Sequence, residues 1–129
     1  MKKLSFATAL ALVLAAGPGS AFTASNGLQV TDQGGGTFLV AYGGKSGPRA
    51  FWCAAGDYAR RVLGLRVTDN LWRMSEPPRG AGQGVIFSVS PQGAATDAGI
   101  ARFGPPSGRF SVGRAQNYCN DPADMVRED

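Results

Sequence analysis

The side chains of this sequence best suited to chemistry are carboxylates, because the chain contains no histidine. Two carboxylates that flank a bond can hydrolyse a glycoside. The acidic residues before the C-terminal tail are Asp32, Asp57, Asp69, Glu76 and Asp97. All except Asp57 fall in expected turns or at strand ends, and Asp57 falls in an expected helix beside arginines. A surface ion pair explains Asp57, so a carboxylate-dependent hydrolase is the alternative interpretation and no catalytic residue is assigned.

The absence of histidine excludes several other classes of site. Serine and cysteine hydrolases of the triad type use histidine as their base. Many zinc sites and most haem sites also need a histidine ligand. The two cysteines of the chain cannot by themselves hold an iron–sulfur cluster. We predict neither a metal nor a cofactor.

Two short patterns resemble functional motifs only in part. Lys45-Ser46 offers a Ser-Lys pair, but Ser46 is better explained as a helix cap. The glycine-rich segment 80–84 resembles a phosphate-binding loop. It precedes an expected strand and opens no helix, so its context is wrong for dinucleotide binding.

Cys53 and Cys119 are the only cysteines, and we expect them to form a disulfide. The bond would connect the middle of the chain to its end and would stabilise a small domain by about 4 kcal/mol in the chain-entropy model. Two free buried thiols are the alternative. No C-x-x-C motif is present, so a redox-active pair is not indicated.

The N-terminal segment 1–21 has the pattern of a signal peptide. Lys2 and Lys3 precede an uncharged run from Leu4 to Ala16, and small residues precede Ala21, after which we predict cleavage. The alternative is an uncleaved anchor, but spanning a bilayer takes about 20 apolar residues. A periplasmic or secreted protein without a stable membrane anchor is expected.

Charge gives little indication of a partner. The chain has 13 basic and 9 acidic residues, and two of the basic ones are Lys2 and Lys3 of the signal segment. The remaining excess of positive charge is too small to indicate nucleic-acid binding. We expect a monomer whose partner is an envelope protein or a small ligand.

A helix that begins at Pro48 and ends at Gly64 is the strongest structural prediction. Proline suits the first turn, and glycine suits the residue after the last turn. Phe51, Ala55, Tyr58 and Val62 recur at helical spacing. The other side of the helix carries Arg49, Asp57, Arg60 and Arg61.

Alternating apolar residues predict short strands on both sides of this helix. The expected strands are 28–31, 37–42, 71–76 and 85–91, with a weaker fifth at 100–103, and Ser111 caps a short helix that continues through Cys119. This order predicts an α+β fold, with a small antiparallel sheet of four or five strands packed by one main helix. The disulfide would tie the short C-terminal helix to the main one. One domain is expected over 22–120, followed by an acidic flexible tail over 121–129.

The aromatic residues favour a core, with an exposed tryptophan as the exception. Small domains bury most of their area through a few aromatics. Trp52 or Trp72 could instead lie on a second face and contact a partner beside an arginine. The candidate binding site is therefore Trp52, Asp57, Arg60 and Trp72.

The run FWCAAGDYA over 51–59, with the later Tyr118-Cys119, resembles a group of small exported alphaproteobacterial proteins. Members of that group share a signal peptide, a helix with this run and a Tyr-Cys near the end. The resemblance supports export and the Cys53–Cys119 bridge, and it implies no catalytic residue. The leading interpretation is a non-enzymatic binding module. A structural or inhibitor-like envelope protein is a further alternative.

Overall fold

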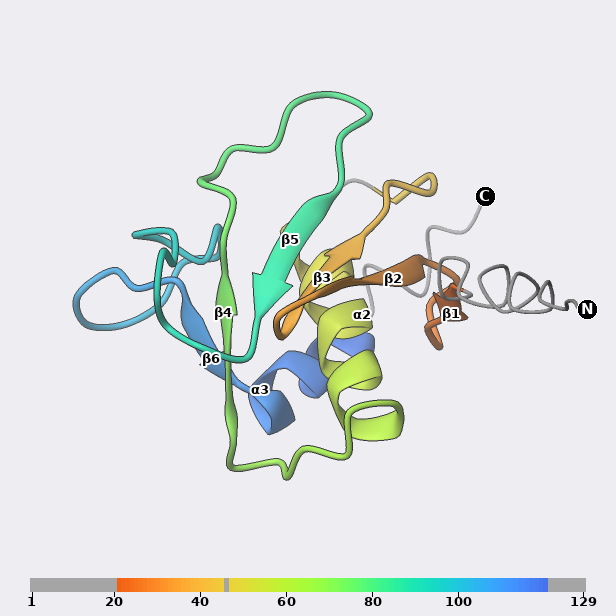
Figure 1. The fold of residues 1–129 in the computed structure, drawn as a ribbon. Coiled ribbons are helices and arrows are strands. Elements are labelled where there is room, and N and C mark those ends of the chain that lie inside the picture. The colour runs from red at the N-terminus through yellow and green to blue at the C-terminus, as the bar shows by residue number, and fades with distance from the viewer. Residues whose placement is uncertain (1–20, 46, 121–129) are drawn as a thin grey trace, which may run out of the picture.

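The chain folds into one antiparallel sheet in which the strands follow the order β1-β2-β3-β5-β4-β6 (Figure 1). The computed structural model describes residues 21–45 and 47–120. The strands are β1 (Phe22–Thr23), β2 (Gln29–Gly34), β3 (Thr37–Val40), β4 (Asn70–Arg73), β5 (Val85–Ser88) and β6 (Arg109–Ser111). The α+β class is confirmed, and the sheet has 6 strands where four or five were expected.

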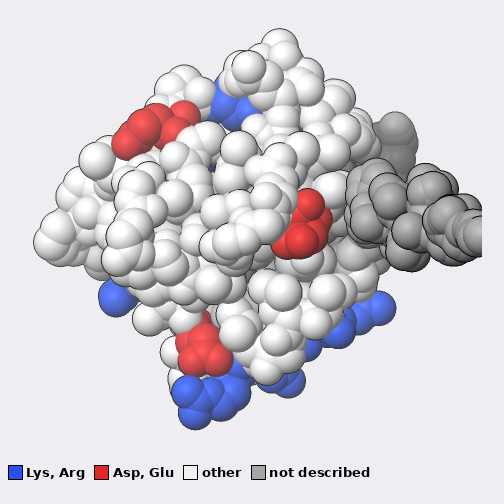
Figure 2. All heavy atoms as spheres, viewed as in Figure 1, with Lys and Arg blue, Asp and Glu red and all other residues white. Residues whose placement is uncertain are grey.

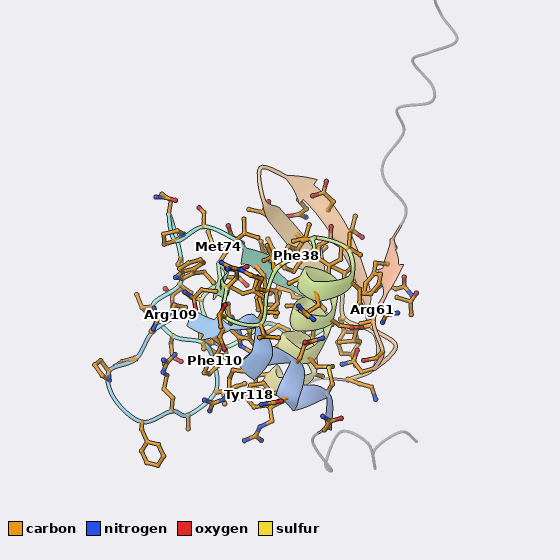
Figure 3. All side chains as sticks on the ribbon, turned by 90° about the horizontal axis from the view of Figure 1, so that it is seen from below. Phe38, Arg61, Met74, Arg109, Phe110 and Tyr118 are labelled. Atoms are coloured by element: carbon orange, nitrogen blue, oxygen red, sulfur yellow. A yellow bond between two sulfur atoms is a disulfide. The ribbon has the colours of Figure 1, made fainter. Side chains whose placement is uncertain are left out.

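Within 21–45 and 47–120, two helices and one 3-10 turn complete the fold: α2 (Pro48–Arg61), α3 (Val112–Asn117) and η1 (Tyr118–Asn120). Gly47 is the N-cap of α2 and Pro48 occupies its first turn, as predicted. The Ser111 side chain accepts a hydrogen bond from the Arg114 N–H at 3.1 Å, which confirms Ser111 as the cap of α3. The two helices lie side by side (Figures 1 and 3).

The core lies between α2 and one face of the sheet, and it is largely aromatic. The Trp52 ring lies 4.7 Å from the ring of Phe87 and 4.9 Å from that of Phe110. The Phe38 ring lies 4.6 Å from that of Tyr58. The core interpretation of the aromatics is therefore confirmed for these helix residues. On the other side of α3, Phe110 and Tyr118 lie next to each other (Figure 3), with ring centroids 5.9 Å apart.

The strand prediction at 100–103 is wrong, and two strands were missed. Gly99 has a φ of +87°, which turns the chain just before Ile100, and Ile100 then enters the core from a loop. The missed strands are β1 and β6, which have 2 and 3 residues. Segments this short show no alternation that a sequence pattern can detect. The β2–β3 hairpin was predicted correctly, and its turn uses positive φ angles at Gly34, Gly35 and Gly36.

A disulfide between Cys53 and Cys119 joins α2 to η1, as predicted from the cysteine count. Cys53 is fully buried, and the residues that it connects are 66 positions apart in the sequence. The bond therefore holds the end of the domain against its main helix.

Three sequence-based expectations fall outside the described residues. These are the signal segment up to residue 20, the acidic tail at 121–129 and the role of Ser46 as a cap. Over 21–45 and 47–120, none of the helices has the length and apolar character that crossing a bilayer requires.

Candidate functional site

The structure places Trp52 in the core, so its expected role on the surface is corrected. The side chain is 0% exposed. Its indole N–H donates a hydrogen bond to the backbone oxygen of Ala98 at 2.9 Å. A buried tryptophan with its single donor satisfied has no group left for a partner.

Asp57 is also buried rather than exposed, although it does pair with Arg61 as expected. Its Oδ2 accepts the Ser25 backbone N–H at 2.8 Å and an Arg61 N–H at 3.0 Å. The carboxylate therefore fastens the segment between β1 and β2 to α2. Arg60 is exposed, and its guanidinium donates to the Leu65 oxygen at 3.1 Å, beyond the helix end.

Trp72 lies away from these three residues. It belongs to β4 and is half-buried. It lines an open cavity of about 440 Å³ with Leu65, Asp69 and Val89 among its neighbours. The four residues of the sequence-based site are thus divided between the core, the surface of α2 and a separate hollow.

A different residue stands out as a candidate for the site: Arg73, the last residue of β4. Only 2% of Arg73 is exposed, and it shares the inner side of the strand with Leu71. Its Nε–H donates to the Ser75 oxygen at 2.6 Å. Its Nη2 is buried and has no hydrogen-bond partner among the described residues. Burying a guanidinium without satisfying its donors is costly, so such a nitrogen indicates a position where a ligand can bind.

Arg73 lines a cavity of about 280 Å³, the inner cavity, where β4 ends and β5 begins. The other residues that line it are Pro48, Phe51, Pro77, Pro78, Arg79, Val85 and Gly99. These come from the start of α2, from β5 and from the two loops that follow β4 and β5. Most of these residues are apolar in type, but polar atoms make up nearly half of the exposed lining. Pockets for small ligands combine apolar walls with a few polar groups.

A wider cavity of about 520 Å³, the outer cavity, adjoins the inner one. Both are lined by Pro77, Pro78 and Gly99, and the outer one also by Asp97 and Arg102. Arg102 donates from Nη1 to the Arg109 oxygen at 2.7 Å, while its Nε is buried without a partner among the described residues. We call the two cavities together the proline cleft.

Three features of the surrounding loops shape the proline cleft. The peptide bond between Pro77 and Pro78 is cis. A Cβ atom on Gly99 would lie 2.7 Å from Nη1 of Arg73, and the φ of +87° also favours glycine there. The Arg79 guanidinium stacks over the rings of Tyr42 and Phe51 at 5.2 and 5.0 Å from their centroids. Arg79 is therefore held at the wall of the inner cavity.

The charges around Arg73 nearly balance. Burial lowers the pKa of Arg73, Asp97 and Glu76 act to raise it, and Arg79 acts to lower it. Neither carboxylate forms a salt bridge with Arg73 within the described part of the chain. Instead, Asp97 Oδ1 accepts the Gly99 N–H at 2.8 Å, and Glu76 accepts the N–H and hydroxyl of Thr96 at 2.8 and 3.1 Å. Both carboxylates are therefore engaged by the 96–99 loop.

Hydrolysis by paired acids needs two carboxylates that flank one bond. Among the described residues, Asp97 is the one carboxylate that lines either cavity. Across the described residues, no three Asp, Glu, Cys or His side chains gather closely enough to hold a metal ion. The cleft offers the buried guanidinium of Arg73 beside the apolar side chains of the inner cavity.

Part of this site, the inward-facing Arg73, could have been recognised from the sequence. The alternation over 71–76 places Leu71, Arg73 and Ser75 on one face, and Leu71 is apolar. An arginine on the inner face of a strand is unusual and marks a position to inspect. The loops that complete the cleft had no such pattern.

Comparison of the chain with known protein families, with curated proteins and with solved structures finds no match for it.

Proposed function

We propose that this protein is a non-enzymatic periplasmic or secreted module that binds a small ligand in the proline cleft. The observation that carries the proposal is Arg73, which is buried at the inner cavity with one nitrogen unpartnered. Natural proteins leave few buried polar groups unsatisfied, and those that remain often belong to functional sites. Export is supported by the signal-like N-terminus and by the disulfide.

A small ligand fits the site better than a nucleic acid does. Pockets for small molecules range from about 300 to 1,000 Å³. The outer cavity, of about 520 Å³, lies within that range, and the adjoining inner cavity, of about 280 Å³, lies just below it. On the face shown in Figure 2, basic atoms gather along the lower edge and acidic atoms form separate patches. That face offers no continuous basic surface of the kind that follows a phosphate backbone.

The test is titration of the ¹⁵N-labelled protein, with its disulfide intact, by benzoate, benzamide and benzylamine. These probes share one ring and differ in charge. At least one of them is expected to shift the amide signals of Gly99, Val85 and Arg79, which line the inner cavity, more than those of the β2–β3 turn.

A matched pair of variants controls for non-specific binding. Pro48 is exposed and lines the inner cavity, so Pro48→Trp should fill the cavity and remove the shifts. Arg49 is also exposed but does not line the cavity, so Arg49→Trp should leave them in place. Absence of any shift with all three probes, or shifts that persist in Pro48→Trp, would contradict the proposed function.

A further inference from the structure

The guanidinium of Arg73 has a geometry that selects among anions. A guanidinium carries a rigid fork of donors that matches the two oxygens of a carboxylate. In Arg73 the Nε–H is already bound to the Ser75 oxygen at 2.6 Å. The two terminal nitrogens remain. Nη2 has no partner in the described structure. Nη1 lies where a side chain at position 99 would stand, because a Cβ atom added to Gly99 would be 2.7 Å from it. These two nitrogens form the free side of the fork.

The fixed charges near Arg73 limit the charge of a ligand. Two carboxylates, Asp97 and Glu76, and two guanidinium groups, Arg73 and Arg79, influence one another here. Their formal charges cancel. A single added negative charge would be attracted by Arg73 at contact distance. A second one would be opposed by Asp97, which lines the adjoining outer cavity, and by the exposed Glu76.

The walls of the inner cavity limit the rest of the ligand. Apart from the two arginines, the residues that line it are proline, phenylalanine, valine and glycine. The apolar side chains can pack against an apolar body, and the polar atoms of the lining can bind a charged group. The start of α2 adds a weakly positive end through Pro48, the first residue of the helix.

We propose that the inner cavity binds the carboxylate of a small apolar monocarboxylic acid, with Arg73 as its receptor. The two carboxylate oxygens would accept hydrogen bonds from Nη1 and Nη2, and the apolar body would lie against Pro48, Pro77 and Val85. This inference rests on the proposed function, because it names the class of ligand for the same cleft. Phe51 and Arg79 also line the cavity, and the Arg79 guanidinium lies over the Phe51 ring at 5.0 Å from its centroid.

The experiment compares the affinities of the same probes and adds inorganic phosphate. Benzoate is expected to bind at least roughly tenfold more tightly than benzamide or benzylamine, as a charged hydrogen-bond pair would require. The Arg73 Nε–H signal should shift with benzoate. Phosphate, kept as a dianion by working above its second pKa, should neither shift that signal nor compete with benzoate, because Asp97 and Glu76 oppose its second negative charge.

Two variants test Arg73 itself. Arg73→Lys keeps the charge but loses the fork, and benzoate affinity should fall at least roughly tenfold. Arg73→Met removes the charge and is expected to fold, since replacing a buried, poorly paired ion by an apolar residue is often tolerated. It should bind benzoate no better than benzamide. Circular dichroism and the intact disulfide check the fold of each variant.

The outcomes separate this inference from the proposed function. Equal affinities for benzoate and benzamide, at a site that Pro48→Trp blocks, would overturn the carboxylate inference and leave a binding module in place. Competition by phosphate would overturn the preference for a monoanion. Failure of every probe to bind would overturn both proposals. Even if Arg73→Met does not fold, the benzoate–benzamide comparison and the Arg73 Nε–H signal in the unmodified protein decide the question.

Discussion

At the scale of single residues, hydrogen-bond satisfaction identifies the site better than residue type does. Trp52 has the side chain most typical of a binding surface, but it is fully buried and its N–H is bonded to the Ala98 oxygen. Arg73 has the side chain most typical of a solvated surface, but it is buried with a nitrogen unpartnered. Because a buried donor without an acceptor is costly, the second case supports the proposed site and the first indicates packing.

Tyr58 should make the protein less stable at alkaline pH. Burial, and then the negative charge of Asp32, raise the pKa of its hydroxyl above the ordinary value of 10.0. The folded state therefore holds this proton more tightly than the unfolded state does. The contribution of Tyr58 to stability is complete below about pH 10 and is lost as the pH rises through the folded-state pKa. Urea unfolding measured at neutral pH and above pH 10 should show the decrease.

The matched variant for this prediction is Tyr58→Phe, which keeps the ring contact with Phe38 at 4.6 Å and removes the ionisable group. Its free energy of unfolding should decrease less between the two pH values. The difference between the two proteins isolates Tyr58 from the other groups that titrate at high pH. Equal decreases in both proteins would contradict the assignment.

At the scale of elements, the contact between α2 and α3 depends on a glycine. A Cβ atom at Gly56 would lie 2.9 Å from the Ala115 Cβ and 2.9 Å from the Gln116 backbone nitrogen. Helix propensity alone would make Gly56→Ala stabilising by about 1 kcal/mol. Overpacking costs about 1–3 kcal/mol, and one of these neighbours is backbone that cannot rotate away. We therefore expect Gly56→Ala to lower the urea midpoint.

Arg60→Ala provides the comparison, because Arg60 is exposed on the same helix. Its effect should stay within about 0.5 kcal/mol, as for most surface changes. A Gly56→Ala protein that is more stable than the original would contradict this prediction, because it would show that α2 and α3 can shift apart to accept the methyl group without losing stability.

The elements also show how far the sequence predicts the fold. The helix at 48–61 was recognisable because Pro48, Gly64 and the apolar spacing all agree with one another. The strands β1 and β6 were not, because they are too short to show an alternating pattern, and β6 also pairs with a strand far away in the sequence. Distance in the sequence is also why the proline cleft was missed. Its walls come from the start of α2 and from the segments around Pro77 and Gly99, which only the tertiary fold brings together.

At the scale of the whole molecule, the end of the domain is held to its middle in two ways. Strand β6 pairs with β4, and α3 with η1 packs on α2. Phe110 of β6 contacts the Trp52 ring at 4.9 Å, so the apolar core continues into this last segment. The Cys53–Cys119 bond adds a covalent link at the same place.

The disulfide should account for a large part of the net stability. Closing a loop between residues 66 positions apart lowers the entropy of the unfolded chain. The chain-entropy model gives about 4 kcal/mol for a loop of this size, while small domains have a net stability of only about 5–15 kcal/mol. The double variant Cys53→Ala with Cys119→Ala should therefore unfold at a clearly lower urea concentration.

The unmodified protein under reductant provides the comparison, because it loses the bond but keeps both sulfur atoms, that of the buried Cys53 and that of the half-buried Cys119. Similar losses in the two cases would assign the effect to the covalent link, and a much larger loss in the double variant would assign the excess to packing at Cys53, which is 0% exposed. Reductant should not change the unfolding of the double variant. If that variant unfolds at the same urea concentration as the oxidised protein, then β6 pairing and the aromatic contacts hold the C-terminal segment without the disulfide.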